Sequence, residues 1–240
     1  MVRIAIIIPC FNEEKSILQL HNELVKITQL SEIEIIPLFI NDCSTDNSEK
    51  ILKENKLNHI NLPINLGIGG VIQCGLKYAY NESFDYAIQL DGDGQHPPSE
   101  LYKIIDQLIN TKNDLVIGSR YLDIKSFEST RLRRFGIAYF SWIIFILTRV
   151  KIKDCTSGFR GFSRKAMELA LYHYPDEYPE PESILYFNRN KLIINEIPVI
   201  MRERENGTSS INGWKSIYYM VKVTISILFN YIKFQKNENN

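Results

Sequence analysis

The sequence predicts an α/β fold in which a mostly parallel β-sheet is flanked by helices. Between residues 3 and 120, short runs rich in Ile, Leu and Val alternate with stretches whose apolar residues recur at helical spacing. The short runs carry no polar alternation, which is typical of strands that are covered on both faces. Strands that alternate with helices in this way form right-handed βαβ units with parallel neighbours.

The individual elements follow from these runs in order. Strands are expected at residues 4–8, 33–40, 59–62, 86–90 and 114–117. Helices are expected at residues 17–27, at about 46–54, from 70 through 80 and after Pro98. In the second half, a strand is expected at 192–197, and residues 154–162 have the glycine-rich polar character of a turn. The 240 residues suit one large domain, alone or with a small appendage.

Composition and charge exclude several classes of function. The formal net charge is zero, so no overall field favours nucleic acid as a partner. No apolar segment is free of charge over the ~20 residues that span a bilayer, and the apolar run at the N-terminus is too short for a signal peptide. The four cysteines are scattered without metal-binding spacing, which is typical of free thiols in a reducing compartment. A cytoplasmic protein is therefore expected, with any membrane contact peripheral.

Two aspartates follow the strand that begins at Tyr86. Asp91 and Asp93 are separated by one glycine, and a second glycine and a Pro-Pro pair come soon after them. In open α/β sheets, ligands bind outside the carboxyl ends of the strands, so these carboxylates are expected at the mouth of a site. Oxygen ligands at this spacing suit Mg²⁺ or Mn²⁺ held between the protein and substrate phosphates. The alternative is an ordinary polar turn after a strand.

The second half contains an apolar run preceded by arginines. The run Phe135–Thr148 would be about 21 Å long as a helix, against ~30 Å of bilayer hydrocarbon, so it does not span. Arg131, Arg133 and Arg134 precede it. The run is expected to form either a buried core helix or a helix that lies in the membrane interface.

The last segment, Trp214–Phe234, has the pattern of an amphipathic helix. On a helical wheel its polar residues form one narrow stripe made of Lys222, Ser226, Asn230 and Lys233. The broad apolar face contains Ile217, Met220, Val221, Ile225, Leu228, Phe229 and Ile232. Such a face packs either on the rest of the domain or on a membrane surface, and the sequence leaves both open.

Several motifs occur in order, each at the end of an expected strand. The first four are Pro9-x-Phe11-Asn12-Glu13, Asn41-Asp42-x-Ser44-x-Asp46, Asn65-x-Gly67 and Asp91-Gly92-Asp93-Gly94-Gln95. This series resembles the inverting glycosyltransferase family 2, whose members have a GT-A fold with a Rossmann-like, mostly parallel sheet.

Three later motifs resemble the polyprenyl-phosphate branch of that family, which includes the dolichyl-phosphate mannose synthases. They are Gly118-Ser119-Arg120-Tyr121, Asp154-x-x-Ser157-Gly158-Phe159 and Arg204-x-x-Gly207-x-Ser209. The resemblance covers residues 3 to about 212. It implies a GT-A catalytic domain over 1–212, followed by an amphipathic docking helix and a polar tail over 213–240.

The resemblance also implies a role for each matching position. The residues that would bind the nucleotide-sugar are Pro9, Phe11, Glu13, Asp42, Asn65, Gly67, Asp91 and Gln95. Pro9, Glu13 and Asp42 would lie at the base and ribose. Asp91 and Asp93 would hold Mg²⁺ or Mn²⁺ beside the donor pyrophosphate. Arg120 and Arg131 would meet the acceptor's phosphate, and Arg204 the phosphates around the metal. The donor would be UDP- or GDP-linked, because no motif distinguishes the two bases.

Two kinds of acceptor need different residues. A polyprenyl phosphate, with a second pKa of ~6, is already anionic near neutral pH and needs arginines rather than a base. A saccharide hydroxyl needs a positioned carboxylate, and the candidates are Asp154 and the acidic loop with Glu177, Glu180 and Glu182. The resemblance, together with the arginines beside an apolar run, implies sugar transfer to a polyprenyl phosphate in cell-envelope glycan synthesis. The alternatives are transfer to a saccharide hydroxyl and, in another class, a non-catalytic protein that binds a membrane surface.

Overall fold

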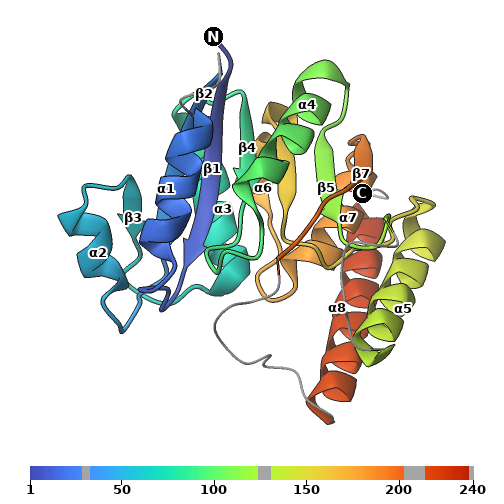
Figure 1. Ribbon diagram of the computed structural model, residues 1–240. Helices are drawn as coiled ribbons and strands as arrows, with labels where there is room; N and C mark the ends of the chain where they lie inside the picture. Colours follow the sequence, from blue (N-terminus) through green and yellow to red (C-terminus); the bar gives the residue numbers. More distant parts are fainter. Residues whose placement is uncertain (29–32, 124–130, 203–213, 238–240) are drawn as a thin grey trace.

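The chain folds around one seven-stranded sheet with helices on both faces (Figure 1). The structure is a computed structural model that describes residues 1–28, 33–123, 131–202 and 214–237. In spatial order the strands are β3 (His59–Asn61), β2 (Glu34–Asn41), β1 (Arg3–Cys10), β4 (Tyr86–Gln89), β6 (Arg160–Ser163), β5 (Leu115–Ser119) and β7 (Ile194–Pro198). Only β6 runs antiparallel to its neighbours in this sheet, so the prediction of a mostly parallel sheet is confirmed.

The helices lie on the two faces and at one end of the sheet. They are α1 (Ile17–Thr28), α2 (Ser48–Glu54), α3 (Gly67–Asn81), α4 (Leu101–Asn110), α5 (Arg131–Thr148), α6 (Arg164–Tyr172), α7 (Pro179–Arg189) and α8 (Trp214–Asn237). A short 3₁₀ turn, Pro98–Glu100, precedes α4. Each strand predicted in the first half is present within a few residues, whereas β6 and α6 were not predicted.

The strand β6 is the main departure from the sequence prediction. Residues 160–162 were assigned to a turn, yet β6 pairs antiparallel with both β4 and β5. The strand begins at the charged Arg160 and contains Gly161, so its own pattern gives no strand signal. A Cβ at Gly161 would lie 2.5 Å from the Cγ2 of Ile104, which shows that α4 packs directly on this strand. The neighbours, rather than local propensity, therefore determine the conformation of β6.

The core consists of two hydrophobic clusters, one on each face of the sheet. In β1, Ala5 and Ile7 belong to one cluster, whereas Ile4, Ile6 and Ile8 belong to the other. All five side chains are buried, which explains why the strand reads as an uninterrupted apolar run. Helices α1 and α4 cover one face, and α3, α6 and α7 cover the other.

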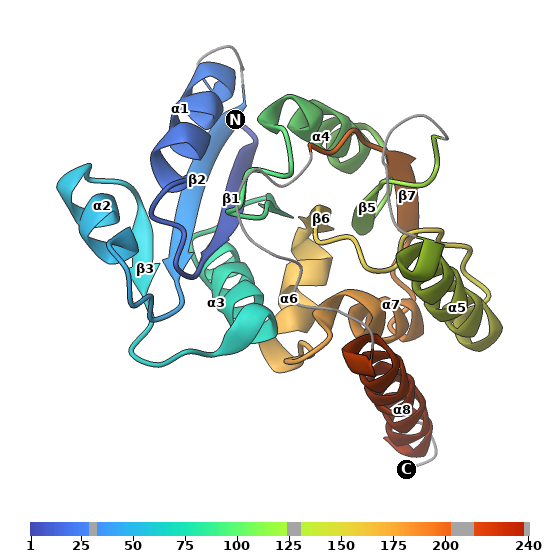
Figure 2. The same cartoon turned by 60° about the horizontal axis from the view of Figure 1, so that its bottom comes forward.

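The helices α5 and α8 lie side by side at one end of the molecule, and α7 packs against both of them (Figures 1 and 2). Figure 2 shows the pair on the outer side of α7, away from β1 and β2. Within the described residues, none of the helices combines the length and the apolar character needed to cross a bilayer.

The carboxyl ends of three parallel strands meet at one edge of the sheet. Cys10, the last residue of β1, is paired with Asn41, the last residue of β2, and Gln89 at the end of β4 is paired with Ile7. The loops that follow these strands carry most of the predicted site residues. The fold therefore gathers, at one edge, motifs that are separated by about thirty to fifty residues in the sequence.

Candidate active site

The loops after β1 and β2 are tied together by hydrogen bonds. Asn12 has a φ of 59°, and its Oδ1 accepts hydrogen bonds from the backbone N–H groups of Thr45 (2.8 Å) and Asp46 (3.3 Å). The N–H of Glu13 donates to Oγ of Ser48 at 2.9 Å. These bonds fix the Pro9-to-Glu13 motif against the Asp42-to-Asp46 motif, so the structure brings the two predicted halves of the nucleotide pocket together.

Asp42 is buried and holds the start of α3. Its two carboxylate oxygens accept hydrogen bonds from the N–H groups of Leu66 (2.7 Å) and Gly67 (3.0 Å), and its carbonyl accepts one from Nδ2 of Asn65 at 3.2 Å. Gly67 has a φ of +73°, which favours glycine at this turn. The predicted pocket residues Asp42, Asn65 and Gly67 therefore form one unit, in which the Asp42 carboxylate satisfies the first amides of a helix.

Asp91 and Asp93 lie in the loop that follows β4. The N–H of Asp91 donates to Nδ1 of His96 at 3.2 Å, and the N–H of Gln95 donates to Oδ1 of Asp93 at 3.0 Å. A Cβ at Gly92 would lie 2.5 Å from the carbonyl oxygen of Pro9, so the loop passes directly against the end of β1. The predicted metal-binding carboxylates thus lie next to the first motif of the nucleotide pocket.

His96, which the sequence left without a role, is buried beneath this loop. Its ring stacks on Phe159 with the centroids 5.0 Å apart. Burial lowers the pKa of His96, against the opposing effect of the Asp91 and Asp93 carboxylates, so the imidazole is neutral at pH 7. Because Nδ1 accepts a hydrogen bond, the proton is on Nε2, which lies 3.7 Å from Oδ2 of Asp91.

The loop before β6 packs against the same carboxylate. A Cβ at Gly158 would lie 3.0 Å from both Oδ1 of Asp91 and Nε2 of Gln89. Nε2 of Gln89 is buried and has no hydrogen-bond partner among the described residues. The absence of a side chain at position 158 therefore leaves room for the Asp91 carboxylate.

This arrangement fits a divalent ion that is completed by substrate. Asp91 and Asp93 supply oxygen ligands, and the adjacent His96 carries no competing positive charge. Among the described residues, no group of three or more His, Cys, Asp or Glu side chains could hold a metal ion by itself. Mg²⁺ in nucleotide-binding enzymes is commonly held by one or two carboxylates, with substrate phosphates and water as the other ligands. Asp91 and Asp93 would supply the protein ligands of a site of that kind.

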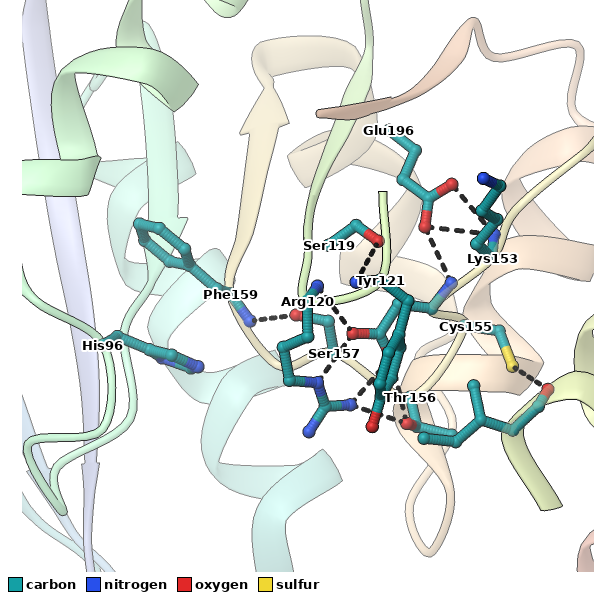
Figure 3. A network of polar contacts seen from close by, with 12 residues as sticks. His96, Ser119, Arg120, Tyr121, Lys153, Cys155, Thr156, Ser157, Phe159 and Glu196 are labelled. Carbon is teal, nitrogen blue, oxygen red and sulfur yellow. Dashed lines mark hydrogen bonds and ion pairs between the residues drawn. The ribbon is translucent and has the colours of Figure 1, made fainter. Parts of the chain in front are cut away.

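Arg120 and Asp154 form a buried bidentate ion pair (Figure 3). Nε of Arg120 donates to Oδ2 of Asp154 at 2.6 Å, and Nη2 donates to Oδ1 at 2.7 Å. The backbone N–H of Arg120 also donates to Oδ2, and Nη2 donates to Oγ1 of Thr156 at 2.9 Å. Burial alone would lower the pKa of Arg120, but the hydrogen bonds to Asp154 outweigh it and raise that pKa. Arg120 is therefore a permanently charged group with a fixed orientation.

A second carboxylate, Glu196 on β7, holds the loop that carries Asp154. Its Oε1 and Oε2 accept hydrogen bonds from the N–H of Lys153 at 3.0 and 2.8 Å. Oε1 also accepts one from the N–H of Asp154 at 2.7 Å. Figure 3 shows Glu196, the loop and Arg120 as one connected network.

A fully buried arginine, Arg160, joins this loop to α7. It donates to the carbonyl oxygens of Cys155 (2.9 Å) and Ser157 (2.7 Å) and to Oγ of Ser183 (2.9 Å). Burial raises the pKa of Glu180, in the first turn of α7, and the positive charge of Arg160 opposes that effect.

The other two carboxylates of the acidic loop bind α8. Nζ of Lys222 lies 2.6 Å from Oε2 of Glu177. Oγ of Ser226 donates to Oε1 of Glu182 at 2.7 Å, and the Asn230 amide donates to Oε2. Burial raises the pKa of Glu182. Lys222, Ser226 and Asn230 of the polar stripe therefore face the protein.

Two of the predicted arginines cannot be located at the site. Arg131 is the first residue of α5, but its side chain lies outside the described part of the chain, and so does the whole of Arg204. The predicted boundary at residues 212 and 213 lies outside it as well. The sequence, in turn, missed His96, Arg160 and Glu196. The sequence feature that could have identified Arg160 and Glu196 is a single charged residue inside a segment that forms a strand.

Sequence comparisons connect this site with a known family. Residues 5–169 match the family model described as glycosyl transferase family 2. A Methanococcus voltae protein named UDP-N-acetylglucosamine–dolichyl-phosphate N-acetylglucosaminyltransferase is 32% identical and aligns over 91% of this chain and 94% of its own. The polyprenol monophosphomannose synthase of Mycolicibacterium smegmatis is 25% identical and aligns over 92% of this chain and 85% of its own.

A solved structure has the same fold. Glucosyl-3-phosphoglycerate synthase from Mycobacterium tuberculosis, in complex with Mn²⁺, UDP-glucose and phosphoglyceric acid, superposes with a TM-score of 0.71 at 17% identity. The match covers 96% of this chain and 80% of the synthase. At that identity the likeness concerns the fold alone.

Proposed function

Because this chain belongs to glycosyl transferase family 2, we propose that it moves one sugar, with inversion, from a nucleotide-sugar to a polyprenyl phosphate. A phosphate oxygen of the acceptor forms a bond to the anomeric carbon, and the bond from that carbon to the donor's diphosphate breaks. The names of the two relatives, one with a dolichyl-phosphate and one with a polyprenol monophosphate, support this acceptor class. Both align over about nine-tenths of this chain.

The Arg120–Asp154 pair is the observation that supports a phosphate acceptor over a hydroxyl acceptor. Asp154 was a candidate base for a hydroxyl acceptor, yet it is fully buried and both of its oxygens accept hydrogen bonds from Arg120. A carboxylate held in this way is poorly placed to take a proton from a sugar hydroxyl. A phosphate monoester needs no base, because its second pKa is ~6. What it needs is an oriented cation, and Arg120 is one.

The donor would bind at the loops after β1, β2 and β4. Phe11 is half exposed and offers a flat apolar surface to a base, and Pro9 and Glu13 lie in the same loop. Asp42 would shape the pocket through its bonds to the start of α3, where Asn65 and Gly67 lie. We propose a UDP-linked donor, which the name of the Methanococcus voltae relative supports.

The leaving diphosphate would lie at Asp91, Asp93 and Gln95. A Mg²⁺ or Mn²⁺ ion held by the two aspartates would neutralise the charge that develops on the leaving oxygen. The protein itself positions the two aspartates. The backbone N–H of Gln95 donates a hydrogen bond to the Asp93 carboxylate, and neutral His96 accepts one from the backbone N–H of Asp91. Arg204 and Arg131 complete the phosphate-binding set in this proposal.

A membrane-binding surface would supply the lipid substrate. α8 packs on the protein through polar-stripe residues and through the buried Val223 and Ile227, and its opposite side is turned outward. The exposed apolar residues on α8 are Val221, Ile225, Leu228, Phe229 and Ile232, and those on the neighbouring α5 are Phe135, Trp142 and Ile146. Eight such side chains lie on two adjacent helices, and an exposed apolar patch is the kind of surface that marks an interaction site. We propose that it docks on the cytoplasmic face of a bilayer, where polyprenyl chains reside.

Sugar-transfer assays test the acceptor. Purified protein with Mn²⁺ and a panel of UDP- and GDP-sugars is given undecaprenyl phosphate, undecaprenol or an oligosaccharide. We expect product only with the phosphate, since the alcohol lacks the anion that Arg120 would bind. Transfer to the oligosaccharide but not to the lipid phosphate would favour the hydroxyl-acceptor alternative, with Glu180 as its base. Vesicle flotation without any release of nucleoside diphosphate would favour a non-catalytic membrane-binding protein.

A further inference from the structure

We infer that Glu196 is a positioning residue for the acceptor's phosphate, acting through Asp154 on Arg120. The inference rests on the proposed function, in which Arg120 meets that phosphate. It also assigns Asp154 the task of orienting Arg120, in place of the role of a base.

Both ends of the network are anchored to one pair of strands. Arg120 directly follows β5, whose parallel neighbour β7 carries Glu196 in register with Ile117. From β7 the Glu196 carboxylate reaches the loop before β6 and accepts the N–H groups of Lys153 and Asp154 at 2.7 to 3.0 Å. The same pair of strands therefore positions the guanidinium and the carboxylate that binds it.

The bonds to Arg120 leave little freedom for its side chain. Asp154 accepts from Nε, from Nη2 and from the backbone N–H of the same arginine, so it fixes both ends of that side chain. Thr156, two residues further along the loop, accepts a further bond from Nη2 at 2.9 Å. Any shift of the loop backbone moves both acceptors together. Glu196 is the side chain that bonds this backbone at Asp154 itself.

The charges explain why a carboxylate is used at position 196. Two adjacent backbone amides point at Glu196, and an anion accepts such bonds more strongly than a neutral group does. An amide side chain at position 196 would keep the size of the residue but would turn one of its own N–H groups toward these donors. The loop would then lose part of its anchor while the buried Arg120–Asp154 pair stays intact. Outer hydrogen-bond partners of this kind typically change affinity or activity by about 10- to 100-fold.

The test compares Glu196→Gln with Glu54→Gln, a control on α2 whose exposed carboxylate pairs with Lys50. Three quantities are measured with Mn²⁺ present: the dissociation constant of farnesyl phosphate, a short soluble prenyl monophosphate; the dissociation constant of UDP; and KM and kcat for undecaprenyl phosphate. We expect Glu196→Gln to weaken farnesyl phosphate binding and raise KM by about tenfold. UDP affinity and the melting temperature should match the control.

The pH profile separates positioning from base catalysis. If Asp154 only orients Arg120, kcat for Glu196→Gln follows the same pH curve as in the wild-type protein. In Asp154→Asn, the loss of a general base would lower kcat by about 10²- to 10⁴-fold and remove the acid limb, with farnesyl phosphate binding unchanged. That result would overturn the inference. The double variant Glu196→Gln/Asp154→Asn should bind farnesyl phosphate no more weakly than Asp154→Asn alone, because both changes act through Arg120.

The remaining outcomes separate the inference from the proposed function. Suppose that Glu196→Gln weakens farnesyl phosphate binding but the wild-type protein transfers no sugar to undecaprenyl phosphate. The proposed function would then be wrong, and the positioning role would stand. Unchanged farnesyl phosphate affinity in Glu196→Gln, equal weakening of UDP, or no binding of farnesyl phosphate by the wild-type protein would each overturn the positioning role.

Discussion

At the scale of single residues, Gly158 shows how little space surrounds the candidate metal site. We expect Gly158→Ala to displace Asp91, because its Cβ would lie 3.0 Å from Oδ1 of that residue and 3.0 Å from Nε2 of Gln89. Calorimetric titration of UDP with Mn²⁺ should show about tenfold weaker binding. Gly136→Ala on α5 is the control, since its Cβ would meet only the sulfur of Met220 at 3.9 Å. Equal affinities in the two variants would contradict this packing argument.

Asp93→Asn removes the negative charge at the same site while it keeps the size of the side chain. The asparagine keeps an oxygen that can accept the N–H of Gln95, as Asp93 does at 3.0 Å, but it removes a negative ligand. We expect UDP binding to lose its dependence on Mn²⁺ while the fold is retained. Asp106→Asn, at an exposed carboxylate on α4, should behave as wild type. Undiminished Mn²⁺-dependent binding in Asp93→Asn would exclude the metal role.

The sequence could predict residues whose role depends on their position after a strand. Asp91 and Asp93 follow an apolar run directly, and the edge of a parallel sheet is where such residues meet. It could not predict that Arg120 binds both oxygens of Asp154, because the pair depends on a loop and a strand that give no local signal. The same holds for His96, whose tautomer follows from a backbone bond to Asp91.

At the scale of elements, α8 shows why a helical pattern does not reveal which face is buried. The wheel separates a polar stripe from an apolar face, but Val223 and Ile227, which the apolar face did not include, are fully buried. An apolar face is normally the one that meets the core. Here the side of α8 that meets the protein combines Val223 and Ile227, which are buried in the core, with part of the polar stripe. Glu177 and Glu182, in and beside the first turn of α7, offer partners to Lys222, Ser226 and Asn230. That choice depends on residues about forty positions away in the chain.

The outward apolar face of α8 makes a testable prediction for membrane binding. Ile225→Asp combined with Phe229→Asp should abolish flotation with anionic phospholipid vesicles. Burial of two such side chains contributes about 3–6 kcal/mol, or more than about 100-fold in partitioning. The control pair is Leu18→Asp with Tyr172→Asp, two exposed apolar positions on α1 and α6. Flotation that survives the α8 changes but not the control changes would place the membrane contact elsewhere.

At the scale of the whole molecule, the two halves of the sheet differ in how readily the sequence predicts them. Strands β1 to β4 form from βα repeats whose connections are short, so their parallel order follows from right-handed crossovers. The order β6-β5-β7 depends on β6 entering between β4 and β5 from a later part of the chain. The residues predicted for the donor end lie in the loops of the first half, which the structure places at one edge of the sheet. The acceptor end depends on the second half, where pairing over long sequence separations decides the geometry.

This division predicts that donor binding stabilises the protein independently of its membrane face. UDP with Mn²⁺, at about 100 times its dissociation constant, should add about 2.7 kcal/mol to the free energy of unfolding. For a chain of this size, that is a rise of about 5–10 °C in melting temperature, measured by differential scanning fluorimetry. The α8 variant with Ile225→Asp and Phe229→Asp should show the same rise, and Asp93→Asn should show none. A larger rise with GDP than with UDP would assign the donor to the other base, and a rise that survives EDTA would contradict metal-dependent binding. If UDP no longer raised the melting temperature of the α8 variant, the apolar surface of α8 and the donor pocket would be one cooperative unit. Only then could a change at an outer helix alter binding at the carboxyl ends of β1 and β4.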